Sequence, residues 1–259
     1  MTALSNYGKR NYMSRTAVIT GGSNGIGKEV ALMMAREGII ILINYFSDEA
    51  SANRIILEAE RVGSKAFAVK ADMGTMKGVE SVYEAAINSL GHIDILFNNA
   101  GVFIENDFIH ATEESYDRTM NVIAKGSFFL TQMIVKHMIE NGIKGRIVNT
   151  SSSVTKDPKQ IPVDYCMAKA SINNFTKAVA SQIGIYGITC NAILPGAIPT
   201  NINKWQFDIP ELREKFIEGS VMKQLGDTKY IAEAVKYFIS DNAKWTTGAL
   251  LSVDGGYTI

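Results

Sequence analysis

The chain lacks the features that mark secreted, membrane and nucleic-acid-binding proteins. Its 259 residues include only two cysteines, Cys166 and Cys190, so we expect no disulfide framework and a reducing setting. Basic and acidic residues number 26 each, and this zero net charge gives no sign of a nucleic-acid or anionic-membrane partner. No apolar run approaches the roughly 20 residues that cross a bilayer. These absences predict a soluble, cytoplasmic protein.

Short β-branched runs alternate with longer segments of helical period. The seven runs are mostly apolar throughout, as in strands that are covered on both faces, and they span 16–20, 39–44, 65–70, 94–99, 145–151, 188–194 and 249–255. The helical segments span 25–37, 48–62, 75–90, 113–140, 164–184 and 228–240. This alternation predicts an α/β fold: a doubly wound, Rossmann-type, seven-stranded parallel sheet with helices on both faces.

The chain shows no linker or repeat. Residues 1–14 contain no apolar run long enough for a signal peptide, and we expect them to form a flexible tail. Residues 15–259 are predicted to form a single domain. Within it, 196–227 is long and irregular, which is typical of a functional loop that covers a substrate.

A glycine-rich turn follows the first predicted strand. The segment TGGSNGIGKEVA, residues 20–31, places Gly21, Gly25 and Gly27 where the strand gives way to a helix. Small residues there let the backbone approach a pyrophosphate, which the free N–H groups and the helix dipole attract. The spacing is G-x-x-x-G-x-G, and a tight turn without a ligand is an alternative. Its position in the fold favours a dinucleotide.

The chain resembles the short-chain dehydrogenase/reductase family, in the group with a T-G-x-x-x-G-x-G turn. Other motifs follow in family order: NNAG at 98–101, Asn121, a serine 13 residues before Y-x-x-x-K, PGAIPT at 195–200 and VDGG at 253–256. The resemblance implies an NAD(P)-dependent oxidoreductase. Such an enzyme transfers a hydride between a nicotinamide and the carbon of a carbonyl or secondary alcohol.

Tyr165 and Lys169 form the Y-x-x-x-K motif and would lie one helical turn apart. A free tyrosine has a pKa of about 10, which is poorly matched to neutral pH. An ammonium about 5 Å away at an effective dielectric near 20 favours the phenolate by roughly 3 kcal/mol, which lowers the pKa by about two. We therefore expect Tyr165 to act as the acid in reduction and the base in oxidation. An exposed surface pair is the alternative.

Ser152 and Asn121 complete the catalytic set that the resemblance implies. Ser152 follows a predicted strand and would donate a hydrogen bond to the substrate oxygen. Ser151 and Ser153 flank it, so a slip of one residue would change the assignment. Asn121 would belong to a proton relay that runs from Lys169 through a water. Alternatively, it is a helical asparagine bonded to backbone.

The resemblance also implies the nucleotide contacts. Asp72 would meet the adenine, Asn98 and Gly101 would line the adenosine side, and Ile198 and Thr200 would hold the carboxamide. The full predicted set is Gly21, Ser23, Asn24, Gly25, Ile26, Gly27, Tyr45, Phe46, Ser47, Asp72, Met73, Asn98, Ala100, Gly101, Tyr165, Lys169, Pro195, Gly196, Ile198 and Thr200.

The end of the second strand decides between NAD and NADP. An acid there binds the ribose 2′-hydroxyl and repels a 2′-phosphate. Tyr45 stands in place of that acid, and Phe46 and Asn24 stand where related NADP enzymes carry an arginine. The sequence therefore predicts NADP with some use of NAD.

Within the family, glucose 1-dehydrogenases are most similar, above all over PGAIPTNINKWQFDIPE. Phe103 and Val154 replace an acid and a polar ring of those enzymes, which makes the predicted pocket more apolar than a polyol requires. The 3-oxoacyl-carrier-protein reductases share the same catalytic motifs and are the alternative. A non-catalytic dinucleotide-binding regulator is a third possibility, but it would not need Ser152, Tyr165 and Lys169.

Two helices predict assembly. The segment 126–140 is apolar over more than the one stripe that a surface helix needs, and the helix after Tyr165 is similar. The resemblance implies a homotetramer with twofold-related helices. We expect no metal, because His92, His110 and His137 have no second ligand at metal-binding spacing.

Overall fold

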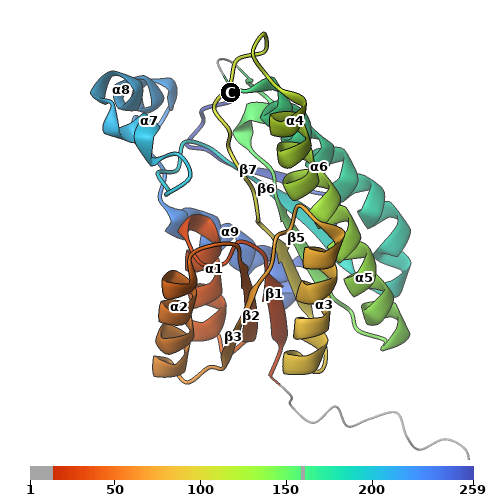
Figure 1. The fold of residues 1–259 in the computed structure, drawn as a ribbon. Coiled ribbons are helices and arrows are strands. Elements are labelled where there is room, and N and C mark those ends of the chain that lie inside the picture. The colour runs from red at the N-terminus through yellow and green to blue at the C-terminus, as the bar shows by residue number, and fades with distance from the viewer. Residues whose placement is uncertain (1–13, 159–160) are drawn as a thin grey trace, which may run out of the picture.

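A computed structural model describes residues 14–158 and 161–259 (Figure 1). All but the last residue of the predicted tail, 1–14, lies outside the described residues.

One sheet of seven parallel strands forms the centre of the molecule. Its order is β3-β2-β1-β4-β5-β6-β7, so the direction of winding reverses between β1 and β4. The strands are β1 (Thr16–Ile19), β2 (Ile40–Tyr45), β3 (Ala66–Lys70), β4 (Ile95–Asn98), β5 (Arg146–Thr150), β6 (Thr189–Pro195) and β7 (Leu250–Val253). This topology confirms the predicted doubly wound fold. Because every pair is parallel, all carboxyl ends meet at one edge, where such folds bind ligands.

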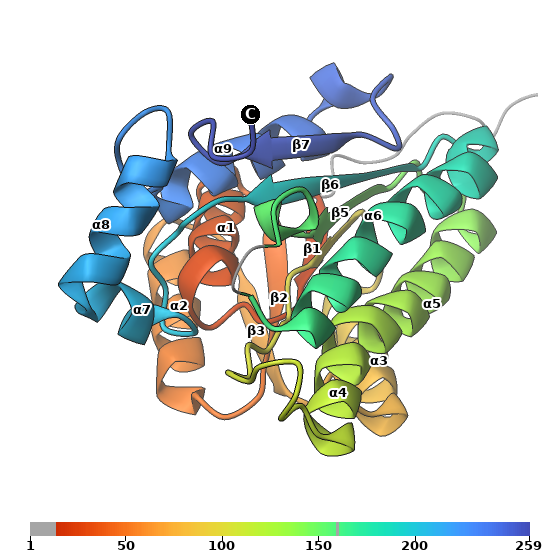
Figure 2. The ribbon, with the colours of Figure 1, turned by 90° about the horizontal axis from the view of Figure 1, so that it is seen from above.

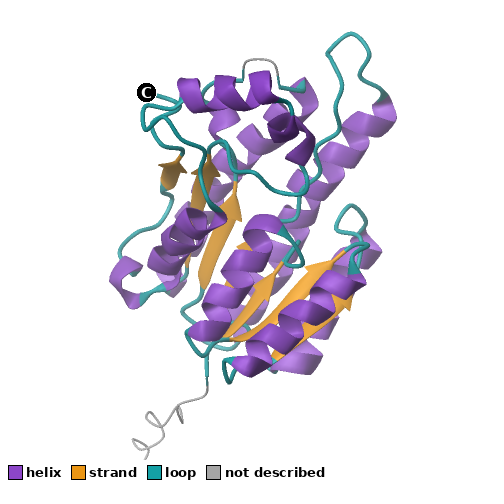
Figure 3. Ribbon diagram, turned by 90° about the vertical axis from the view of Figure 1, so that its left-hand side faces the viewer, coloured by secondary structure: helices purple, strands orange, loops and turns teal. Residues whose placement is uncertain are grey.

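Helices cover both faces of the sheet (Figures 2 and 3). One core cluster joins the sheet to α1 (Gly25–Arg36), α2 (Glu49–Arg61) and α9 (Thr228–Ile239). A second joins it to α3 (Met76–Leu90), α5 (Gly126–Glu140) and α6 (Val163–Ile183). Side chains of both clusters come from successive strand residues that point to opposite faces, such as Ala17 and Val18. This explains why the strands are apolar almost throughout.

The predicted helix 113–140 consists of three pieces. These are α4 (Glu113–Met120), a π-helical turn (Asn121–Lys125) and α5, joined without a break in helical dihedral angles. The Gly126 amide donates to the Asn121 carbonyl, which widens the turn by one residue. A Cβ at Gly126 would collide with the Met73 carbonyl oxygen, so only glycine lets the helix approach the loop after β3 so closely.

The irregular segment 196–227 contains two short helices, α7 (Lys204–Asp208) and α8 (Pro210–Gly219). Pro210 occupies the first turn of α8, where its missing N–H has no helical partner to lose. The two helices project from the body of the molecule at the carboxyl edge of the sheet (Figure 1). Among the described residues, no helix has the length and apolar character that spanning a membrane requires.

Candidate active site

A cleft opens at the carboxyl edge of the sheet. Most predicted site residues line it, namely Gly21, Ser23, Asn24, Gly25, Ile26, Tyr45, Phe46, Ser47, Ala100, Gly101, Ser152, Tyr165, Lys169, Pro195, Gly196, Ile198 and Thr200. The sequence analysis missed eight further residues of the lining, Asp48, Asn99, Val102, Thr150, Ser151, Asn201, Ile202 and Asn203. They are sequence neighbours of predicted residues, so extending each strand-end motif by a few positions could have found them.

The glycine turn has a geometry that side chains would not allow. Gly21 and Gly25 have φ angles of 61° and 54°, in the left-handed region that favours glycine. Gly27 does not line the cleft, but a Cβ there would collide with the Gly21 carbonyl oxygen. The start of α1 therefore packs directly under the turn. The first two residues of α1, Gly25 and Ile26, line the cleft, and a helix N-terminus at a cleft is suited to an anionic ligand.

Three polar side chains hold this turn in place. Thr20 and Asn99 belong to the T-G-x-x-x-G-x-G and NNAG motifs, but the sequence analysis assigned them no contact, and Asn44 belongs to neither motif. The Thr20 hydroxyl accepts from the amides of Asn99 and Ala100 at 2.9 and 3.0 Å. The Asn99 side chain donates to the Gly21 carbonyl at 3.1 Å. The buried Asn44 amide accepts from the Gly21 N–H at 3.4 Å and donates to the Ala71 carbonyl at 2.9 Å. The turn is thus tied to β2, β3 and β4 before any ligand arrives.

The end of β2 differs from the sequence prediction in one respect. Tyr45 is only 8% exposed and packs in the core, whereas Phe46 is 58% exposed beside the cleft. The sequence has Tyr45 where related NAD enzymes carry an acid. The Asp48 carboxylate, three residues further along the chain, lines the same cleft. It accepts from the Ser51 amide at 2.9 Å and from Asn24 at 3.2 Å, and these bonds lower its pKa to about 2. A negative charge therefore borders the predicted 2′ position.

Three predicted adenosine contacts lie outside the cleft lining. The Asn98 side chain is buried beneath it and donates to Thr131 and Asn149, both at 2.8 Å, because the last residue of β4 points into the helix layer. Met73 is 5% exposed and packs in the core. The Asp72 carboxylate is bound by Arg118 at 2.7 Å. The side chains of Asn98 and Met73 therefore point away from the cleft, and Asn99 lines it. Contacts of Asp72, Met73 and Asn98 with the nucleotide stay predictions.

Ser152, Tyr165 and Lys169 meet in the cleft. Tyr165 and Lys169 lie on one face of α6, and the Lys169 ammonium is 5.7 Å from the centroid of the Tyr165 ring. Ser152 follows β5 and lines the cleft with Tyr165, where its hydroxyl acts to lower the pKa of the phenol. Ser151 is committed elsewhere, since its hydroxyl donates to the Lys169 carbonyl at 3.0 Å. This geometry favours Ser152 over Ser151 as the partner of Tyr165.

Burial outweighs the expected effect of Lys169 on Tyr165. Removal from water raises the pKa of Tyr165 to about 12, although the hydrogen bond from Ser152 opposes the rise. Burial also lowers the pKa of Lys169 to about 8. Its Nζ donates to the Thr150 carbonyl at 2.8 Å and lies beside the phenol ring. The predicted fall in the pKa of Tyr165 is thus wrong, because burial raises that pKa instead.

Asn121 lies apart from the other catalytic candidates. It occupies the π-helical turn and lines a separate hollow with Met120, Phe128 and Phe175. Its carbonyl accepts from Gly126. The structure therefore places Asn121 outside the cleft lining, between α4 and α5.

The loop after β6 crosses the mouth of the cleft. Thr200 is held by Asn203, whose Oδ1 accepts from its amide at 2.8 Å and from its hydroxyl at 3.0 Å. Asn203 in turn donates to the Ile198 carbonyl at 3.0 Å. Asn201 donates to the Asn24 side chain at 3.2 Å, which links the loop to the glycine turn. Asn203, which no motif identified, thus fixes the two residues that were predicted to contact the carboxamide.

Comparisons with known proteins agree with this geometry. Residues 21–258 match a family model described as enoyl-(acyl carrier protein) reductase. An L-rhamnose 1-dehydrogenase (NADP(+)) of Thermoplasma acidophilum is 34% identical and covers 96% of this chain and 98% of its own. Glucose 1-dehydrogenase 2 of Bacillus subtilis is 32% identical over 96% of this chain and 97% of its own.

A solved structure supports the same assignment. A short-chain dehydrogenase of Burkholderia cenocepacia in complex with NADP has a TM-score of 0.88 and 27% identity, covering 95% of this chain and 98% of its own. The fold, the family model and the relatives therefore agree. The chain belongs to the short-chain dehydrogenase/reductase family of NAD(P)-dependent oxidoreductases.

Proposed function

We propose that the protein oxidises or reduces a small carbonyl or alcohol substrate with NADP(H), and that it also uses NAD(H). The observation that carries this proposal is the meeting of Ser152, Tyr165 and Lys169 in one cleft with a glycine turn. When bound, the nicotinamide supplies or accepts the hydride. A dinucleotide-binding regulator would need the turn but not these three side chains. Steady-state oxidation of NADPH with any carbonyl substrate would exclude that class.

The glycine turn would hold the diphosphate. Gly21, Ser23, Asn24, Gly25 and Ile26 border the cleft where the N–H groups of α1 are unpaired by the helix. Ala100 and Gly101 form the opposite wall, and small residues there leave room for the ribose. Ile198 and Thr200, fixed by Asn203, would orient the carboxamide.

Proton transfer falls to Tyr165. In reduction its phenol gives a proton to the substrate oxygen, and in oxidation it takes that proton back. Ser152 donates to the same oxygen and positions it. The raised pKa keeps the phenol protonated but also makes it a weaker acid, so the nearby positive charge of Lys169 is needed to favour release of the proton. Lys169 supplies a positive charge beside the ring, and Asn121 would relay protons to it through a water.

Two classes of substrate, aldoses and 3-oxoacyl thioesters, are compatible with the family. We propose that the substrate is an aldose oxidised at C1, as in glucose 1-dehydrogenases, because both sugar-dehydrogenase relatives align over nearly the whole chain. The alternative is a 3-oxoacyl thioester. One observation favours it: the Phe103 ring lies edge-on against Tyr165 at 5.1 Å between centroids, so an apolar surface borders the reacting group.

A substrate panel tests this choice. One arm offers glucose and rhamnose with NAD and NADP, and the other offers an acetoacetyl thioester with NADPH. We expect reduction of the nucleotide with at least one aldose and a far lower rate with the thioester. The opposite ranking would assign the protein to acyl reduction. Inactivity in both arms, with nucleotide binding intact, would show that neither substrate class is correct.

We further propose that the protein is a cytoplasmic homotetramer. Phe128 is 45% exposed on α5 and lies 5.8 Å from the Phe175 ring of α6, and both border the apolar hollow that contains Asn121. Figure 2 shows α4, α5 and α6 together on one side of the molecule, where a twofold partner could pack against them. Sedimentation of a monomer at micromolar concentration would contradict this assembly.

A further inference from the structure

Arg118 contacts Phe46, which lines the cleft, although no sequence motif pointed to this arginine. Its guanidinium carbon sits over the face of the Phe46 ring, 5.1 Å from the centroid. Its Nη1 donates to both oxygens of Asp72, at 2.7 and 2.8 Å. The end of β2, the turn after β3 and helix α4, which lie far apart in the sequence, therefore meet at one point.

Phe46 offers a flat apolar surface that the chain itself covers only in part. The ring borders the cleft and is 58% exposed, whereas its neighbour Tyr45 is buried in the core. A guanidinium is planar and stacks on aromatic rings, which an ammonium does not do. A nucleobase is likewise flat and stacks on aromatic side chains.

The distance between the Arg118 guanidinium and the Phe46 ring is too short for a nucleobase to fit between them. Two stacked layers on Phe46 need roughly 7 Å, since each contact takes about 3.5 Å. The guanidinium at 5.1 Å must therefore rise by about 2 Å before a ring can enter. Asp72 would anchor this movement, because its carboxylate binds the guanidinium at Nη1 and leaves the rest of the group able to pivot. The Arg118 side chain is also 31% exposed, so there is room for it to move.

We propose that Phe46 and Arg118 form an adenine clamp, in which the adenine ring lies between the phenyl ring and the guanidinium while Asp72 anchors Arg118. This inference rests on the proposed function, because it requires that the cleft bind a dinucleotide. The clamp touches the base and not the ribose 2′ position. It therefore strengthens the binding of NADH and NADPH to the same extent.

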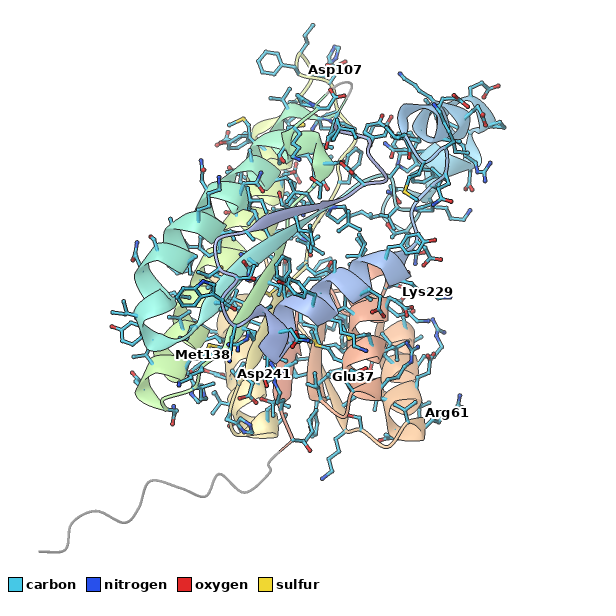
Figure 4. All side chains as sticks on the ribbon, turned by 180° about the vertical axis from the view of Figure 1, so that it is seen from behind. Glu37, Arg61, Asp107, Met138, Lys229 and Asp241 are labelled. Carbon is cyan, nitrogen blue, oxygen red and sulfur yellow. The ribbon has the colours of Figure 1, made fainter. Side chains whose placement is uncertain are left out.

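Four variants test the clamp. Arg118→Met removes the planar cation at similar length, Arg118→Lys keeps the charge without the plane, and Phe46→Leu removes the ring from an exposed position. Arg61→Met is the matched control, since Arg61 is exposed on α2 toward the end of the molecule opposite the tip at Asp107 (Figure 4). Affinities for NADH, NADPH, ADP-ribose and reduced nicotinamide mononucleotide are measured by fluorescence or calorimetry.

We expect Arg118→Met, Arg118→Lys and Phe46→Leu each to weaken NADH, NADPH and ADP-ribose by about tenfold or more. Binding of the mononucleotide, which has no adenine, stays within about twofold of wild type, as do all affinities of Arg61→Met. Circular dichroism establishes whether each variant is folded. If Arg118→Met does not fold, Phe46→Leu still tests the clamp, because Phe46 is exposed and its replacement should not disturb the core.

Three results would overturn the clamp. The first is that Arg118→Met and Phe46→Leu bind the nucleotides as tightly as the wild type. The second is that Arg118→Lys keeps wild-type affinity. The third is that the variants lose affinity for NADPH alone. The last result would make Arg118 a reader of the 2′-phosphate. A wild-type protein that binds neither NADH nor NADPH would instead refute the proposed function itself, so the two failures are distinguishable.

Discussion

Replacing Lys169 with methionine tests how much the buried ammonium costs the fold. The side chain is 4% exposed, and burial lowers its pKa from 10.5 to about 8. The folded chain therefore binds this proton more weakly than the unfolded chain does. Holding the charge in the site costs roughly 3 kcal/mol of folding free energy at neutral pH.

The sign of the pH dependence follows from the lowered pKa. Below pH 8 both states are protonated and the cost is complete. As the pH rises from 8 to 10.5 the unfolded chain still binds the proton that the folded chain has lost, so the cost disappears. Between pH 7 and pH 9 the wild type should recover about 1 kcal/mol that Lys169→Met cannot recover. The raised pKa of Tyr165 acts only above pH 10 and does not enter this window.

Urea unfolding at pH 7 and pH 9, at one protomer concentration, measures this difference. The variant also loses the hydrogen bond to the Thr150 carbonyl, but that loss does not depend on pH and cancels in the comparison. Lys177→Met, which removes an exposed lysine from the same helix, is the control and should follow the wild type. A gap between wild type and Lys169→Met that stays constant with pH would refute the argument.

Three further predictions concern the nucleotide site. Gly27→Ala should weaken NADH and NADPH by about tenfold or more in titrations, because its Cβ would collide with the Gly21 carbonyl and displace the turn; affinities equal to wild type would contradict the close packing. Asp48→Asn keeps the cap on α2 but removes the charge, so it should tighten the binding of NADPH and leave that of NADH unchanged. Ser47→Asp adds a charge, so it should weaken the binding of NADPH and leave that of NADH unchanged. Equal effects on both nucleotides would show that the 2′ position lies elsewhere. Thr20→Val leaves the amides of Asn99 and Ala100 without their acceptor and should lower the free energy of unfolding by about 1–3 kcal/mol in urea, which an unchanged stability would disprove.

Periodic patterns were sufficient to predict the sheet and most helices. Most strands are apolar on both faces because helices cover both sides, and the observed strand bounds differ from the predicted ones by no more than two residues. The π-helical turn at Asn121–Lys125 was not predictable, since its residues have ordinary helical period. The turn ends at Gly126, which approaches the Met73 carbonyl closely, and only the tertiary structure reveals this approach.

The candidate site was predictable where a motif fixes the backbone and not where side chains from distant elements meet. Gly21 and Gly25 could be found because a left-handed turn demands glycine. Arg118 could not, since its link to Phe46 and Asp72 depends on how α4 packs against the ends of β2 and β3. The expected pKa of Tyr165 was wrong for a related reason, because the sequence gives a distance to Lys169 but no measure of burial.

Tyr165→Phe is the most direct test of the proton transfer on which the proposed function depends. The variant removes the hydroxyl beside Ser152 and keeps the ring against Phe103, so the cleft retains its shape. Turnover is measured with the best substrate of the panel, and nucleotide affinity is measured in parallel. We predict a fall in kcat of several orders of magnitude with NADPH affinity nearly unchanged. A variant that keeps roughly a tenth or more of wild-type kcat would contradict the role of Tyr165 as the proton donor.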